Sequence, residues 1–213
     1  MKTSLRARSR TTPSAGFTML EIIVILAVIM ILAATLTPLI LNYLDDAKQA
    51  KAERDVKEIG GALLTLTKDT GHLPIYKDGT KMTGEGDIHL LRGPGNNPVD
   101  FTPSQGQGNA TGQKWLETTK IGELENHVFK NNPGTAPYPA SGRNRWRGPY
   151  LERLSTDPWG NRYLVNVRMA SPEAEDEAPT WVLSAGPNGK IETPSNGAAG
   201  SAPGGDDIVY RVK

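Results

Sequence analysis

The apolar residues of the chain are concentrated near its N-terminal end. Residues 17–44 contain a single charged side chain, Glu21, and residues 22–34 are thirteen consecutive apolar residues. A helix over residues 17–44 would be about 42 Å long at 1.5 Å per residue, which exceeds the roughly 30 Å hydrocarbon core of a bilayer. The pattern therefore predicts a membrane-spanning helix over residues 17–44.

The segment before this helix is basic. Residues 1–16 carry no acid and four bases, which are Lys2, Arg6, Arg8 and Arg10. Basic residues beside a membrane helix favour the cytoplasmic side. The charge pattern predicts a cytoplasmic N-terminus, with the residues after Asp45 on the far side of the membrane.

The small residues that suit a processing site lie before the apolar run. A secretory signal is cut after its apolar core, but residues 33–34 fit that pattern poorly because Leu32 precedes them. Residues 14–16, Ser-Ala-Gly, fit better. Cleavage after Gly16 would remove four bases, change the formal charge from +1 to −3, and leave the apolar helix in the mature chain.

The presence of a charged residue, Glu21, in the apolar segment needs an explanation. A carboxylate within a membrane helix costs several kcal/mol and often marks a functional site. Glu21 either lies in the first helical turn near the lipid headgroups, where the helix dipole favours it, or pairs with an α-amino group created by cleavage. That amine would belong to Phe17 of the same chain or of a neighbouring chain.

The string Gly16-Phe17-Thr18-Met19-Leu20-Glu21, followed by an apolar helix, closely resembles the class III signal of type IV pilins and type II secretion pseudopilins. The resemblance implies that residues 1–16 are a leader peptide cut after Gly16 by a prepilin peptidase. It implies N-methylation of Phe17 and an assembly role for Glu21, which would pair with the terminal amine of an adjacent subunit. Pro38 lies where many pilins have a helix-kinking proline, and it removes one backbone donor.

Residues 45–74 continue the helical pattern in amphipathic form. Apolar residues spaced 4, 3, 4 and 3 positions apart form one stripe, which consists of Ala52, Val56, Ile59, Leu63 and Leu66. We interpret the stripe as packing against the protein's own domain rather than as a coiled coil, because it spans barely two heptads and includes Gly60 and Gly61. Gly71 and Pro74 predict the end of the helix.

The remaining chain predicts a small head with few regular elements. Residues 75–145 are a loop-rich region, with extended loops over 76–112 and a short helix over 114–129. Residues 146–213 contain three strand candidates, predicted to form an antiparallel meander, at 163–167, 180–185 and 208–212. We expect an α+β fold in which the long helix packs on a small antiparallel sheet.

Two motifs narrow the resemblance to the major pseudopilins of type II secretion systems. They are residues 148–151, Gly-Pro-Tyr-Leu, and residues 157–161, Asp-Pro-Trp-Gly-Asn. With the N-terminal string, the resemblance covers roughly residues 12–74 and 146–213. It implies a type IV pilin-like fold and a non-enzymatic subunit of a periplasmic pseudopilus that drives protein export.

The same resemblance implies the partners. These are further copies of the chain in a helical filament, the prepilin peptidase, minor pseudopilins, an inner-membrane assembly platform and inner-membrane lipid. Two alternatives stay open. A type IV pilin or minor pseudopilin, used for adhesion, motility or DNA uptake, would form an exposed fibre, whereas a membrane-anchored periplasmic binding or hydrolytic domain would need a cleft with paired acids.

A polar loop near the C-terminal end offers oxygen ligands. Residues 182–189 and 205–208 bracket it, and calcium prefers six to eight oxygens from carboxylates, amides and backbone carbonyls. From the residues alone, a solvated turn of Gly, Asn and Asp is favoured over a metal site. The resemblance implies a structural calcium held by Asp206, Asp207 and the carbonyl of Leu183. Asn188 stands where the family commonly has aspartate, and residues 193–204 lengthen the loop.

Composition excludes several classes of function. Lys plus Arg is 24 against 23 for Asp plus Glu, so the net charge of +1 gives no reason to expect a nucleic-acid partner. The absence of cysteine excludes disulfides, thiol catalysis and thiolate metal sites. No phosphate-binding glycine loop, G-x-S-x-G or H-E-x-x-H motif is present.

Three groups of residues favour structural interpretations. The acidic run at 173–177 reads as a solvated hairpin loop, and the scattered histidines, His72, His89 and His127, as solvated or half-buried side chains rather than ligands. We interpret Trp146, Trp159 and Trp181 as core residues under the sheet rather than as a sugar-stacking platform.

Overall fold

The computed structural model describes residues 16–80, 88–100, 115, 120–167, 179–194 and 202–212. The chain divides into two compact units, residues 1–45 and residues 46–213, which are described separately. The helix α1, Met19–Thr70, contributes to both.

The start and end of α1 follow from local chemistry. The Thr18 Oγ1 accepts a hydrogen bond from the Glu21 N–H at 3.2 Å, which satisfies one of the free backbone donors of the first turn. At the other end, Gly71 has a φ of +89°, the left-handed conformation that commonly terminates helices. The predicted stop near residue 70 is confirmed.

The first unit consists of the apolar half of α1. Its large apolar side chains are exposed along the whole segment from Phe17 to Leu44. Within the described part of the chain, α1 is the one helix long and apolar enough to cross a membrane. A surface of this kind requires lipid or another protein surface in place of water.

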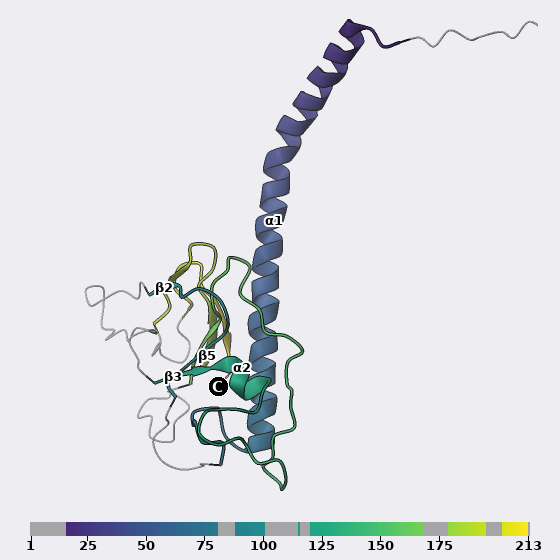
Figure 1. The fold of residues 1–213 in the computed structure, drawn as a ribbon. Coiled ribbons are helices and arrows are strands. Elements are labelled where there is room, and N and C mark those ends of the chain that lie inside the picture. Colours follow the sequence, from purple (N-terminus) through teal and green to yellow (C-terminus); the bar gives the residue numbers. More distant parts are fainter. Residues whose placement is uncertain are drawn as a thin grey trace, which may run out of the picture. The chain divides into compact units, whose positions relative to one another are not determined.

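The second unit contains a five-stranded sheet in the order β3-β1-β4-β5-β7. Its strands, seen in Figure 1, are β1 (Leu90–Arg92), β3 (Ile121–Glu123), β4 (Leu164–Asn166), β5 (Trp181–Ser184) and β7 (Ile208–Arg211). β4, β5 and β7 form the predicted antiparallel meander. β1 is antiparallel to β4 but parallel to β3, so the sheet is mixed rather than wholly antiparallel.

The additional strands correct two predictions. β1 and the short β2 (Val99–Asp100) lie in residues 76–112, which were predicted as loop. The helix predicted over residues 114–129 is α2, which covers only Leu124–Val128. Residues 121–123 are extended because they pair with β1, and this pairing outweighs the weak helical periodicity of the segment.

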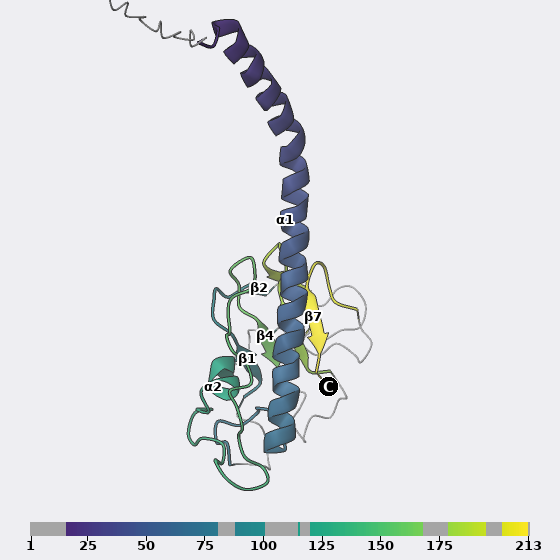
Figure 2. The same cartoon turned by 90° about the vertical axis from the view of Figure 1, so that its right-hand side faces the viewer.

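Both faces of the sheet are buried. One face packs against α1 in a cluster that we call the helix-side core, and Figure 2 shows the second half of α1 passing across β4 and β7. The predicted helix stripe lies there, with Val56, Ile59 and Leu63 against Val165 and Val182. The opposite face forms the far-side core, made of Leu90, Trp115, Leu164, Trp181, Leu183, Ala185 and Ile191.

Two contacts fix α1 on the sheet. Gly60 faces the Tyr210 ring of β7 so closely that a Cβ at position 60 would overlap the ring. Nearby, the Tyr163 hydroxyl donates to Asp55 Oδ2 at 2.8 Å, and Lys51 forms an ion pair with the same oxygen at 2.7 Å. The helix therefore lies on the sheet at a distance set by the absence of a side chain at residue 60.

The motif at residues 148–151 forms hydrogen bonds that hold the end of α1 in place. The Tyr150 hydroxyl donates to Asp69 Oδ2 at 3.2 Å and accepts from the Arg147 N–H at 2.9 Å. The Tyr150 N–H donates to the Val128 carbonyl of α2 at 2.8 Å. One tyrosine thus joins α1, α2 and the segment that leads into β4.

Candidate functional site

The predicted processing and assembly residues lie at the start of α1. Gly16 and Phe17 precede the helix and are exposed. Glu21 is in the first turn and is also exposed. This arrangement leaves the peptide bond after Gly16 outside the helix and places one carboxylate four residues beyond Phe17, where the helix dipole favours it.

The predicted metal residues lie in the head, in the connection between β5 and β7. We call residues 185–194 and 202–207 the β5–β7 loop. It contains a turn at residues 186–189 and the strand β6 (Lys190–Ile191), which pairs in parallel with β2. Leu183 is in β5 with its side chain in the far-side core, so it could contribute to a metal site only through its backbone carbonyl.

Asn188 and Asp206 meet across this loop, although they are 18 positions apart. The Asn188 N–H donates to Asp206 Oδ2 at 3.0 Å. Gly186, with a φ of +61°, allows the approach because a Cβ at that position would overlap the Asp206 carbonyl.

Asp207 is the most buried acid of the loop, with 7% of its surface exposed. Its Oδ2 accepts hydrogen bonds from the N–H groups of Glu192, at 2.8 Å, and Thr193, at 2.6 Å. Burial raises the pKa of Asp207, the hydrogen bonds from Thr193 and Glu192 lower it, and the Glu192 carboxylate raises it further. The net direction is upward because desolvation is the largest of these effects.

Two carboxylate oxygens in this loop are buried and have no hydrogen-bond partner among the described residues. They are Asp206 Oδ1 and Asp207 Oδ1. A buried carboxylate oxygen without a donor is costly, and a bound cation would offset that cost. The chemistry of these two residues therefore fits the predicted calcium site.

Glu192 is a loop residue that sequence reasoning missed. Its Oε2 accepts from the Asn188 Nδ2 at 3.2 Å, while Asn188 Oδ1 accepts from the Lys190 N–H at 2.6 Å. Glu192 lies in the interval between the two predicted ligand strings, which was the one available signal. No three His, Cys, Asp or Glu side chains form a metal-binding group in the described residues, so an ion here would also need amide and backbone oxygens.

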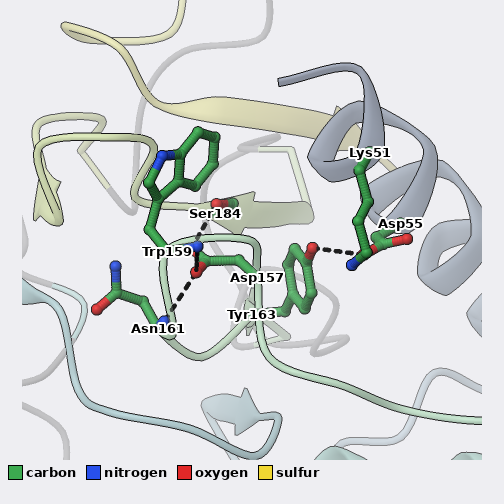
Figure 3. A network of polar contacts seen from close by, with 7 residues as sticks. All are labelled: Lys51, Asp55, Asp157, Trp159, Asn161, Tyr163 and Ser184. Atoms are coloured by element: carbon green, nitrogen blue, oxygen red, sulfur yellow. Dashed lines mark hydrogen bonds and ion pairs between the residues drawn. The ribbon is translucent and has the colours of Figure 1, made fainter. Parts of the chain in front are cut away.

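A second carboxylate organises the neighbouring motif at residues 157–161. Asp157 is 2% exposed, and Figure 3 shows it bonded both to the rest of the motif and to Ser184 of β5. Its Oδ1 accepts from the N–H groups of Trp159 at 3.0 Å and Asn161 at 2.7 Å, and its Oδ2 accepts from the Ser184 hydroxyl at 2.8 Å. The motif is therefore a structural turn anchored to the strand that leads into the β5–β7 loop.

The histidine interpretation is wrong for His127. Its side chain is fully buried on α2, and its Nδ1 lies 2.6 Å from the Tyr138 hydroxyl. Burial, and secondly the charge of His72, lowers the pKa of His127 to about 3. His72 and His89 are half-buried, as expected.

The tryptophan interpretation holds for one residue of the three. Trp181 is in the far-side core, whereas Trp146 and Trp159 are half-buried. The most buried tryptophan among the described residues is Trp115, which the sequence did not single out. The acidic run at residues 173–177 lies outside the described residues.

The combination of one long apolar helix, an amphipathic continuation and a small sheet packed on it defines the α+β fold of type IV pilin-like proteins. Comparison with known sequences gives the family. The sequence profile of "Type II secretion system (T2SS), protein G" matches residues 134–208, which include both sequence motifs.

Relatives in several bacteria carry the description "Type II secretion system core protein G". That of Aeromonas hydrophila is 26% identical over 194 residues, which are 91% of this chain and 90% of the relative. That of Escherichia coli (strain K12) is 26% identical over 86% of this chain and 88% of the relative. That of Vibrio cholerae serotype O1 is 30% identical over 70% of this chain and 67% of the relative.

The chain belongs to the type II secretion system protein G family and is a pseudopilin subunit of that system. The apolar helix α1 anchors the chain in the inner membrane by one pass. No solved structure matches the chain significantly.

Proposed function

We propose that the chain is made as a precursor, cut after Gly16 by a prepilin peptidase, and N-methylated on Phe17. The observation that carries this proposal is the start of α1 two residues beyond Phe17, which leaves the Gly16–Phe17 bond exposed and outside the helix. The basic leader stays in the cytoplasm and the head lies in the periplasm, because four bases precede the apolar segment.

The test is the intact mass and N-terminal peptide of the membrane-extracted protein. The expected chain begins at Phe17 and carries one extra methyl group. Gly16→Leu should leave the leader attached, since a bulky residue would replace the small one at the cleavage position. An unchanged N-terminus in Gly16→Leu would refute this cleavage site.

Glu21 guides assembly in this proposal. It is the one charged side chain within residues 17–44, and its exposed position in the first turn lets it meet the terminal amine of an adjacent subunit. The desolvation of a carboxylate in a filament core is offset by such a pair. Subunits then add repeatedly through their apolar helices, which produces an open helical filament rather than a closed ring.

A matched pair of variants separates this role from helix capping. Glu21→Ala should permit membrane insertion and cleavage but abolish filaments, as measured by the yield of sheared or cross-linked polymer. Thr18→Ala removes the capping hydroxyl and keeps the carboxylate, so it should still polymerise. Normal polymer from Glu21→Ala would overturn the assembly role.

The filament is a periplasmic pseudopilus that pushes folded proteins outward, extended by an inner-membrane assembly platform and completed by minor pseudopilins. The chain has no catalytic step in this account. The description shared by the relatives favours a core pseudopilin over the alternatives of a surface pilin, a minor pseudopilin or an anchored hydrolytic domain.

A structural calcium in the β5–β7 loop completes the proposal. Asp206 and Asp207 supply carboxylate oxygens, Leu183 its carbonyl and Asn188 its amide oxygen, with no charge where an acid is common. When bound, the ion neutralises the buried carboxylates and ties the two ends of the loop. The support is the pair of buried, unpartnered oxygens on Asp206 and Asp207.

Thermal unfolding of the full chain in detergent micelles tests the calcium site. Calcium at a hundred times its Kd would add about 2.7 kcal/mol to the free energy of unfolding and raise Tm accordingly. Asp206→Asn, which keeps the size but removes the charge, should require more calcium for the same shift. A wild-type Tm that does not change at millimolar calcium would remove the site.

A further inference from the structure

The region between α1 and the C-terminal strands contacts the β5–β7 loop at two separate points. The first is β2, whose Val99 pairs with Lys190 in β6. The Val99 N–H also donates to the Gly189 carbonyl at 2.9 Å. The loop is thus held from outside by a strand that comes from residues 88–100.

The second contact is Trp115. It is 2% exposed and belongs to the far-side core with Leu183, Ala185 and Ile191, which lie in β5 and the loop itself. Its indole Nε1 donates to the Thr193 carbonyl at 2.7 Å, a buried hydrogen bond between residues 78 positions apart. Trp115 therefore fixes both the apolar side of the loop and one particular peptide group.

That peptide group is next to the buried carboxylate. The Thr193 N–H donates to Asp207 Oδ2 at 2.6 Å, and the Thr193 Oγ1 accepts from the Gly204 N–H at 2.9 Å. One residue thus connects Trp115 to Asp207 and to the returning end of the loop. The unpartnered Asp207 Oδ1 is the other oxygen of the carboxylate that Thr193 holds.

We propose that Trp115 is a positioning residue for the metal loop: by holding the Thr193 carbonyl, it keeps Asp207 in the orientation that presents Oδ1 to a cation. The inference rests on the proposed calcium site and adds how the loop is held in place for the ion. The loop is kept closed by the protein itself, so the ion binds a preorganised site rather than having to order the loop.

Two features of the sequence explain why the loop would need to be held in place by Trp115. Asn188 offers an uncharged amide oxygen rather than a carboxylate, and Thr193 and Asp207 are 14 positions apart in the chain. Both features weaken binding of a cation, one through charge and the other through the entropy of loop closure. Preorganisation reduces the ordering cost and restores affinity without another ligand.

The far-side core contains a matched control for this proposal. Trp115→Phe keeps an aromatic ring but removes the donor to Thr193. Trp181→Phe makes the same chemical change in the same cluster, where the Trp181 Nε1 is buried without a partner among the described residues. General loss of indole packing affects both variants, whereas loss of positioning affects only Trp115→Phe.

Two measurements on the full chain in detergent micelles decide the matter. The first, without added metal, is the hydrogen exchange of the Glu192 and Thr193 amides, which we expect to be about tenfold faster in Trp115→Phe than in Trp181→Phe. The second is calorimetric titration with calcium chloride, in which Trp115→Phe should bind about tenfold more weakly and Trp181→Phe should match the wild type.

The two measurements separate this inference from the calcium proposal. Equal rates of amide exchange in the two variants would overturn the proposal that Trp115 holds the loop in place. Faster exchange with unchanged calcium affinity would show that Trp115 orders the loop but does not position a ligand, and would also overturn the inference. If wild-type protein binds no calcium, the calcium proposal and the role of Trp115 in it fail together, whereas binding with equal affinities in all three proteins sinks the inference alone.

Discussion

Asp157 provides the sharpest test of how the head is built. Its two oxygens accept three hydrogen bonds, from the N–H groups of Trp159 and Asn161 and from the Ser184 hydroxyl. Asp157→Ala removes all three acceptors. Asp157→Asn keeps one oxygen for the two N–H groups and turns an amide nitrogen toward Ser184, whose hydroxyl can accept as well as donate.

The expected magnitudes differ because the geometry, and not the charge, is the stabilising element. At about 1 kcal/mol for each hydrogen bond, Asp157→Ala should lose about 3 kcal/mol of the free energy of unfolding. In a unit of this size, that loss lowers Tm by roughly 6–12 °C. Asp157→Asn should lose less than about 1 kcal/mol.

The pH dependence gives an independent check on the charge. Burial raises the pKa of Asp157 more than its hydrogen bonds lower it, so the native state holds this proton more tightly than the unfolded chain. Stability from this group is therefore greatest at low pH and decreases as pH rises from the unfolded value of 3.8 through the raised native value. Asp157→Asn lacks this contribution.

Thermal unfolding of the full chain, the Ala variant and the Asn variant should be followed by circular dichroism at pH 7 and near pH 4. The wild type should gain stability relative to Asp157→Asn at the lower pH. Equal losses in the Ala and Asn variants at pH 7 would refute the reasoning, because they would show that the negative charge and not the set of acceptors stabilises the turn.

Two further perturbations test other parts of the head. His127 has a native pKa of about 3 against 6.5 in the unfolded chain, so its burial should cost about 1.4 kcal/mol of stability for each pH unit between 6.5 and 3. In Tm measurements, His127→Gln should flatten that pH dependence, and an unchanged slope would contradict the buried neutral state. In urea unfolding, Gly60→Ala should destabilise the protein by about 1–3 kcal/mol because the new Cβ overlaps the Tyr210 ring. Gly61→Ala has open space at its Cβ and should be neutral or stabilising by up to about 1 kcal/mol. Equal effects of the two substitutions would contradict the close packing of α1.

The elements that the sequence predicted are those whose signal is local and repeated. The stripe Val56, Ile59 and Leu63 repeats at helical spacing, and each of these residues is buried in the helix-side core. Gly71 marks the end of α1 because its own backbone conformation terminates the helix. The β4–β5–β7 meander followed from three apolar runs separated by turn residues.

The elements that the sequence missed depend on distant partners. β1 is only three residues long and its first two residues are buried on opposite faces of the sheet, so it shows no alternation of apolar and polar residues. Residues 121–123 become a strand only because β1 lies beside them. Trp115 and Glu192 likewise acquire their roles from contacts with Thr193 and Asp207, which no local pattern contains.

The burial of both sheet faces determines when the head can fold during synthesis. Asp55 bonds to Tyr163, 108 residues later, and the helix-side core joins Val56 to Val182. The stripe of α1 therefore has no partner until the ribosome has made β4 and β5, and Trp115 waits equally for Thr193. Through that interval the nascent chain exposes two unmatched apolar surfaces besides its membrane segment, which makes it more prone to aggregation than the folded head.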